Sequence, residues 1–143
     1  MKTLRQLLAG KRQSLAAVSP NDAVLHALKV MADNDVGALL VLEGERLVGI
    51  FSERDYARKI ILHGKASKDT KVSEIMSDKV LYVTLDRTVD ECMAIMSEKH
   101  FRHLPVLDDG QHVVGIVSIG DLVKETICEQ EFIIRQLEHY ITH

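Results

Sequence analysis

A hydroxyl and a carboxylate three residues apart occur twice in this sequence, as Ser52 with Asp55 and as Ser118 with Asp121. Each pair follows a short apolar run and precedes a helical pattern, which predicts a strand-to-helix junction. Free backbone N–H groups and the helix dipole favour an anion at such a junction. Each Asp could accept hydrogen bonds from the two vicinal hydroxyls of a ribose, or it could simply cap its helix. The residues alone leave both interpretations open.

The residue before each carboxylate differs between the two junctions, being Arg54 in one and Gly120 in the other. If the two helix starts converge on one cleft, Arg54 supplies a cation and Gly120 leaves space beside it, which suits a phosphate group. Arg58, one turn later, would add positive charge. The alternative for Arg54 is a weak surface salt bridge to Glu53 or Asp55.

Other reactive patterns are incomplete. His100, His103 and His112 could suggest a metal site, but residues three apart in an extended segment face opposite sides. The sequence has no Gly-x-Ser-x-Gly, His-Glu-x-x-His or Cys-x-x-Cys pattern, so we expect no enzyme and no catalytic cofactor. Cys92 and Cys128 lie in apolar helical patterns without ligand spacing, which predicts two buried free thiols in a reducing compartment.

The composition is that of a globular chain of 143 residues, with 46% hydrophobic and 27% charged residues. A formal net charge of −3 argues against an electrostatic nucleic-acid binder. The apolar runs are far shorter than the roughly 18–20 residues of a membrane span, and the first residues carry no long apolar run. We therefore expect a cytoplasmic protein with no nucleic-acid or membrane partner.

The chain contains an internal repeat, which explains why the Ser-x-x-Asp pair occurs twice. From Val18 the sequence reads VSPNDAVLHALKVMADNDVGALLVL, and from Val83, 65 residues later, it reads VTLDRTVDECMAIMSEKHFRHLPVL. After one inserted residue, GERLVGIFSERDYARK from Gly44 matches GQHVVGIVSIGDLVKE from Gly110 at an offset of 66. Each copy of about 45 residues is too short to bury a sheet face and two helices alone, so we expect two sheets packed over a shared core.

Each copy predicts the order strand, helix, strand, strand, helix. Apolar residues at helical spacing fill 24–31 and 89–96. The runs ALLVL and LVGIFS, and their counterparts HLPVL and VVGIVS, predict strands separated by a turn that contains glycine. The residues expected to cap the first helix of each copy are Asn21 or Asp22, and Asp86 or Thr88.

The repeat resembles the cystathionine-β-synthase (CBS) domain, and the tandem pair resembles a Bateman module. The resemblance rests on GIFSERD from Gly49 and GIVSIGD from Gly115, found in register with the rest of each copy. It implies an α+β fold of two β-α-β-β-α units related by a pseudo-twofold axis. It also implies an adenosine-containing ligand such as AMP, ADP, ATP, NAD(H) or S-adenosylmethionine.

The resemblance implies roles for residues of the second repeat. Arg102 and His103, at the start of a strand, would present backbone groups to the adenine edge, and Thr84 would meet ribose or phosphate. Otherwise Arg102 is a solvated strand residue, His103 is a structural histidine, and Thr84 is an ordinary β-branched strand residue. The full set of candidate binding residues is Ser19, Ser52, Arg54, Asp55, Val83, Thr84, Arg102, His103, Leu104, Ser118, Ile119 and Asp121, in which Val83 and Leu104 would be apolar walls and Asp121 the ribose reader.

The first repeat departs from this pattern because Gly37 and Ala38 stand where the second repeat has Arg102 and His103. Whether one nucleotide, two nucleotides or one dinucleotide binds per chain is left open. Because the asymmetry between Arg54 and Gly120 assigns the phosphate contact to Arg54, we expect the number of phosphates to matter less than the adenosine part.

The terminal segments lie outside the two repeats. A short helix is expected from Thr3 to Ala9, stopped by Gly10, and another near Val72 to Met76. A stripe of Ile127, Ile134 and Ile141 with Leu137 beside them predicts a homodimer, unless this helix folds back on its own module. The expected segments are an N-terminal helix and lead-in strand (1–17), the first repeat (18–63), a linker with a short helix (64–82), the second repeat (83–127) and a helical extension (128–143).

The sequence therefore predicts a non-catalytic regulatory module. An adenine nucleotide would bind in the cleft between the repeats and change their relative arrangement, which an unknown downstream protein would recognise. The alternative is an interaction adaptor that has no physiological nucleotide.

Overall fold

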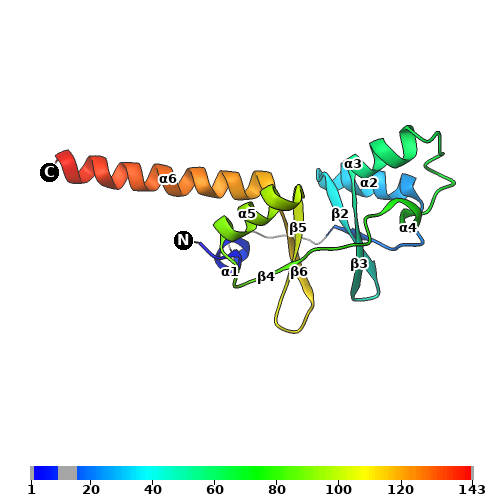
Figure 1. The fold of residues 1–143 in the computed structure, drawn as a ribbon, viewed down its shortest axis with the longest axis horizontal. Helices are drawn as coiled ribbons and strands as arrows, with labels where there is room; N and C mark the ends of the chain where they lie inside the picture. Colours follow the sequence, from blue (N-terminus) through cyan, green and yellow to red (C-terminus); the bar gives the residue numbers. More distant parts are fainter. Residues whose placement is uncertain (1, 10–15, 143) are drawn as a thin grey trace.

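The structure is a computed structural model that describes residues 2–9 and 16–142. It confirms the α+β fold and the predicted element order of both repeats (Figure 1). The first repeat contains β1 (Ala17–Val18), α2 (Val24–Asn34), β2 (Ala38–Glu43), β3 (Arg46–Ser52), α3 (Glu53–Asp55) and the π-helix η1 (Tyr56–Ile61). The second contains β4 (Val83–Thr84), α5 (Val89–Lys99), β5 (His103–Leu107), β6 (Val113–Ser118) and α6 (Ile119–Thr142). Two short helices, α1 (Leu4–Ala9) and α4 (Val72–Ile75), precede the repeats.

Each repeat forms its own three-stranded sheet. The first strand pairs parallel to the second, and the second pairs antiparallel to the third, in the orders β1-β2-β3 and β4-β5-β6. Ala38 lies opposite Ser52 in the first hairpin, and His103 lies opposite Ser118 in the second. These pairs are equivalent in the sequence repeat, so the two sheets share one register and place both Ser-x-x-Asp steps at the same strand end.

Two hydrophobic clusters form, not the single shared core that the sequence predicted. One lies in the first repeat around Phe51 and includes Val72 and Ile75 of α4. The other lies in the second repeat around Leu104 and includes α1. Each core is therefore completed by the short helix that precedes the other repeat.

The backbone shows the same exchange of helices. Val72 N of α4 donates to Asp22 O at 2.8 Å, and Leu4 N of α1 donates to Arg87 O at 2.9 Å. Asp22 and Arg87 are equivalent in the repeat, so the two helices dock in the same way. This exchange explains why two short units with separate cores form one molecule.

The two equivalent helices begin differently. Thr88 caps α5 in a capping box, as predicted. α2 has Ala23 at its N-cap and no side-chain cap, so the prediction of Asn21 or Asp22 as its cap was wrong. Asp22 instead accepts a hydrogen bond from Ser19 N at 2.8 Å.

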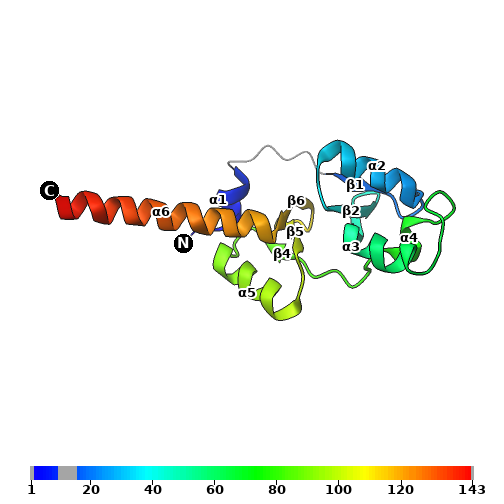
Figure 2. The same cartoon turned by 90° about the horizontal axis from the view of Figure 1, so that it is seen from above.

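Helix α6 runs without a break across the predicted boundary between 127 and 128. Its 24 residues span about 36 Å at 1.5 Å per residue. Figures 1 and 2 show its second half extending away from both sheets, so it does not fold back on its module.

Cys128 on α6 is exposed, contrary to prediction. Cys92 is buried as expected, and burial raises the pKa of its thiol to about 11.

Both predicted short helices are present. Helix α1 begins at Leu4, one residue later than expected, and the predicted stop at Gly10 lies outside the described residues. Helix α4 covers Val72–Ile75, with Met76 as its C-cap.

Candidate functional site

Both Ser-x-x-Asp steps form capping boxes at the start of a helix. Ser52 Oγ accepts from Asp55 N at 3.2 Å, and Asp55 Oδ2 accepts from Ser52 N at 3.1 Å. Asp121 N and Ser118 Oγ, and Ser118 N and Asp121 Oδ2, make the same pair of bonds at 3.1 and 3.0 Å. The capping residue is therefore the serine, and each aspartate occupies the third helical position rather than the N-cap proposed from the sequence.

In the first repeat, Asp55 also joins the helix start to the linker. Its Oδ1 accepts from Ser77 Oγ at 3.3 Å and lies 3.5 Å from Lys59 Nζ. Lys59 in turn donates to Ile75 O at 3.0 Å. Lys59 belongs to η1, a π-helix that replaces the regular α-helix of the second repeat, and π-helical turns often occur at functional sites.

The linker docks against β3 through a close backbone approach. Ile50 N donates to Ser77 O at 3.0 Å, and Ser77 N donates to Ile50 O at 2.9 Å. A Cβ added to Gly49 would lie 2.6 Å from Met76 Sδ and 3.0 Å from Ser77 O. Glycine at position 49 therefore lets the linker reach the sheet and become one wall of a cavity.

A cavity of about 530 Å³ lies at this junction. Its walls come from four places: the turn before β2, the end of β3 with the helix start that follows it, the linker after α4, and the turn before β5 with the first residue of that strand. The cavity is thus built by both repeats. Its lining residues are Gly37, Ile50, Ser52, Glu53, Arg54, Asp55, Arg58, Lys59, Ser77, Lys79, Val80, Leu81, His100, Phe101, Arg102 and His103.

The lining is strongly positive although the chain as a whole is negative. Five lining residues are Lys or Arg and two are carboxylates, against a net charge of −3 for the chain. Lys59 is paired with Asp55. Within residues 2–9 and 16–142, no hydrogen bond or ion pair occupies the side chains of the other four cations, Arg54, Arg58, Lys79 and Arg102. The excess of positive charge favours an anionic ligand.

His103 lies where the two repeats meet. A Cβ on Gly37 would be 4.0 Å from His103 Nε2 and 3.8 Å from Glu53 Oε2. Burial lowers the pKa of His103. The negative charges of Asp121 and Glu53 oppose this effect, and Arg102 adds to it. One carboxylate from each repeat therefore acts on the same imidazole, whose neutral form is favoured by burial.

The cavity gathers five of the predicted binding residues: Ser52, Arg54, Asp55, Arg102 and His103. The other seven lie outside its lining. Val83 and Leu104 are buried in the core of the second repeat; Thr84 is exposed on β4, and Ser19 follows β1. Ser118, Ile119 and Asp121 form the equivalent junction of the second repeat, and their role in binding stays a prediction.

The linker wall of the cavity has its sequence counterpart in the segment before the first repeat. The linker wall formed by Ser77 to Leu81 has its counterpart 65 residues earlier, at 12–16, and the structure describes only the last of these.

The sequence interpretation missed most of the linker wall. Lys79, Val80 and Leu81 were counted as linker, and Phe101 was passed over beside Arg102. Lys79 could have been proposed from the sequence, because this cation lies shortly before Val83, where the second repeat begins. The contribution of Lys59 depends on the π-helix, which no pattern in the sequence indicates.

Metal binding finds no support in the described residues, which contain no group of three or more His, Cys, Asp or Glu side chains suited to hold an ion. His112 lies 3.6 Å from Asp108 and 3.9 Å from Glu45 through its two ring nitrogens, away from the lining of the cavity. No helix in the described part of the chain is long and apolar enough to cross a membrane.

Comparison with known proteins gives consistent results. The CBS domain family matches residues 11–62 and 72–127. The CBS domain-containing protein CBSX3, mitochondrial, of Arabidopsis thaliana is 41% identical over 126 residues, which cover 85% of this chain but only 61% of that protein. A putative signal-transduction protein with CBS domains from Burkholderia ambifaria is 48% identical, with a TM-score of 0.86, over 90% of this chain and 96% of that structure.

A more distant CBS pair, that of the protein MJ0100, was solved in complex with 5′-methylthioadenosine and S-adenosyl-L-methionine. It is 23% identical, with a TM-score of 0.78, over 90% of this chain and 98% of that one. This likeness shows the fold alone. The repeat, the two equivalent sheets and the family match lead to one assignment: the chain belongs to the CBS domain family and contains two CBS domains in tandem.

Proposed function

We propose that this CBS pair is a regulatory module that binds an adenine nucleotide, such as AMP, ADP, ATP or NAD(H), in the cavity between its repeats. The observation that carries the proposal is the cavity itself, because both repeats supply its walls and cations dominate its lining. Its volume of about 530 Å³ falls within the roughly 300–1,000 Å³ of small-molecule sites.

The positive lining suits the phosphate groups. Arg54, Arg58 and Arg102 present guanidinium groups, which bind phosphate oxygens in a bidentate manner. Lys79 adds a further charge. Because several cations share the cavity, we now expect affinity to rise with the number of phosphates, in contrast to the expectation based on Arg54 alone.

The apolar part of the lining suits the base. Phe101 and Leu81 are 41% and 37% exposed although they are large and hydrophobic, and both line the cavity with Ile50 and Val80. A purine stacked on this surface would cover apolar area, which stabilises the complex by about 25 cal/mol per Å². Adenosyl ligands in the MJ0100 pair are consistent with this choice of ligand.

Regulation follows from the position of the site. A ligand that contacts both repeats favours the arrangement in which all its contacts form, and a partner that recognises this arrangement responds to the ligand. The downstream protein is unknown, and the homodimer and the cytoplasmic location remain proposals from the sequence. The chemistry proposed is binding alone, with no catalysed reaction.

A thermal-shift panel with adenosine, AMP, ADP, ATP, NAD(H) and S-adenosylmethionine tests this proposal. A ligand at 100 times its Kd stabilises the fold by about 2.7 kcal/mol, which raises the Tm of a domain of this size by roughly 5–10 °C. We expect the phosphorylated ligands to raise the Tm more than adenosine does. No shift with any of them would favour the alternative, an interaction adaptor without a nucleotide.

A further inference from the structure

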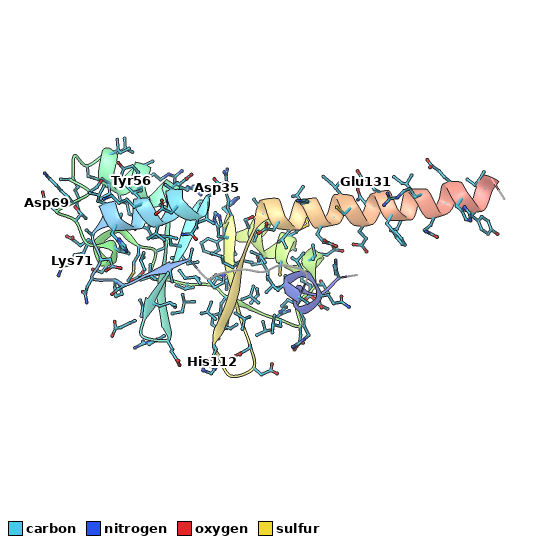
Figure 3. All side chains as sticks on the ribbon, turned by 180° about the vertical axis from the view of Figure 1, so that it is seen from behind. Asp35, Tyr56, Asp69, Lys71, His112 and Glu131 are labelled. Atoms are coloured by element: carbon cyan, nitrogen blue, oxygen red, sulfur yellow. The ribbon has the colours of Figure 1, made fainter. Side chains whose placement is uncertain are left out.

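Helix α6 carries an apolar seam, interrupted only by Gln130, that its own module leaves uncovered. The seam residues recur at alternating spacings of three and four: Val123, Ile127, Gln130, Ile134, Leu137 and Ile141. All six are exposed, from 39% at Val123 to 80% at Ile141. Figure 3 shows the helix around Glu131 lying clear of the rest of the molecule. An apolar surface of this length is unusual on a monomer.

The seam is distinct from the face that packs α6 onto its repeat. That face contains Leu122, which is fully buried, Glu125, which pairs with Lys2 at 3.1 Å, and Thr126, whose hydroxyl lies 3.3 Å from Met93 Sδ. At 3.6 residues per turn the seam lies about a third of a turn away from it. A second chain can therefore cover the seam without displacing the module.

We propose that the seam is occupied by the same helix of a second copy, as a parallel, in-register, two-stranded coiled coil. The inference names a partner for the proposed regulatory module, but it does not depend on the ligand. Its pattern is that of a two-stranded parallel coil: Ile127, Ile134 and Ile141 recur at one heptad position, and Leu137 stands at the other.

Gln130 and the flanking charges favour the parallel arrangement. In an in-register parallel pair, the Gln130 amide of one chain faces the Gln130 amide of the other chain, and the two can hydrogen-bond. An antiparallel pair aligned over the same residues would place Gln130 against an isoleucine and bring the two Glu131 side chains to the same side of the seam. In the parallel pair, the flanking contacts are Glu131 with Thr126 and Glu138 with Ile133, so no like charges meet.

The coil is a feature added to the CBS pair. The family match ends at residue 127, whereas α6 continues to Thr142. The helix nevertheless begins beside a residue of the site, because Ile119 N donates to the carbonyl oxygen of Arg102 at 2.9 Å, and Arg102 lines the cavity. A parallel pair places both modules at the same end of the coil. The start of each α6 is then connected to its cavity by the hydrogen bond between Ile119 and Arg102.

Light scattering of the full chain, coupled to size-exclusion chromatography, tests the seam. We expect a mass near twice the 16.0 kDa of one chain, and 16.0 kDa for Ile134→Glu. The matched control is Phe132→Glu on the opposite side of α6, because the two side chains are 53% and 55% exposed; it should remain a dimer. A wild-type monomer, or an Ile134→Glu variant of unchanged mass, would overturn the proposal.

Cysteine cross-linking tests the direction of the helices. Gln130→Cys in a Cys128→Ser background should form an interchain disulfide on mild oxidation, since a disulfide requires Cα atoms within about 7 Å. A dimer that fails to cross-link would overturn the parallel register. The nucleotide panel on Ile134→Glu separates the two proposals, because the cavity lies outside the seam: a ligand-induced shift should persist in the monomer.

Discussion

Asp55 is held at the junction by more partners than a helix cap needs. One carboxylate oxygen belongs to the capping box with Ser52, and the other lies near Ser77 and Lys59. A ribose hydroxyl could take the place of Ser77 while the helix start stays intact. Ribose reading and capping are therefore not exclusive, because they use different oxygens of the same group.

The Asp55→Asn and Asp121→Asn variants test which carboxylate reads the ribose. We expect Asp55→Asn to weaken nucleotide binding about fivefold to tenfold, roughly 1 kcal/mol for a contact that loses its charge, and Asp121→Asn to weaken it less. This order reverses the expectation from the sequence, because Asp55 lines the cavity and Asp121 does not. Both variants retain an acceptor for the capping box, so the free energy of unfolding should change by less than about 1 kcal/mol.

A 2′,3′-dideoxy nucleotide is the control for this pair of variants. It should bind the wild type poorly and lose little more in Asp55→Asn, because the partner hydroxyls are already absent. Additive losses from the analogue and the variant, measured by calorimetry, would show that Asp55 does not contact the ribose.

The lowered pKa of His103 predicts that the free energy of unfolding depends on pH. Burial lowers its pKa in the folded state, so below the ordinary His value of about 6.5 the unfolded chain binds the proton more readily. The free energy of unfolding should therefore fall as the pH drops from 7 to 5, and it should fall less steeply in His103→Gln. Urea unfolding at several pH values measures both slopes, and parallel curves for the two proteins would contradict the assignment.

At the scale of elements, the exchanged helices explain how the repeats cooperate. Each short helix completes the other repeat's core, and the linker that follows α4 becomes a wall of the cavity. The element order was predictable because apolar periodicity and the repeat agree at every step. The exchange of helices was not predictable, because it depends on contacts between segments far apart in the sequence. Lys79 and Leu81 were missing from the predicted site for the same reason.

The different starts of α5 and α2 give a prediction at this scale. Thr88→Ala removes the capping box of α5 and should lower the free energy of unfolding by about 1 kcal/mol. Asn21→Ala, just before the uncapped start of α2, should change it by less than about 0.5 kcal/mol. Chemical denaturation measures both, and equal losses would contradict the caps described for these helices.

At the scale of the whole molecule, charge separates the two halves of the pseudo-symmetric pair. The repeat relates Arg54 to Gly120 and Arg102 to Gly37, so each of these two cations has a glycine at its equivalent position. The difference between Arg54 and its equivalent residue, Gly120, was already visible in the sequence. Only the structure shows that Arg54 and Arg102, from different repeats, line the same cavity. The molecule is thus symmetric in fold and asymmetric in its binding chemistry.

Titration calorimetry of Arg54→Ala with ATP, AMP and adenosine tests the central claim most directly. The account predicts that the nucleotides lose about 1.5–3 kcal/mol of binding free energy, the value of a lost charge-assisted contact, while adenosine is nearly unaffected. The matched control is Arg46→Ala, which removes an exposed arginine at the start of β3 outside the cavity and should bind as the wild type does. Equal weakening of adenosine and the nucleotides by Arg54→Ala, or an equal loss in Arg46→Ala, would contradict a phosphate site between the repeats.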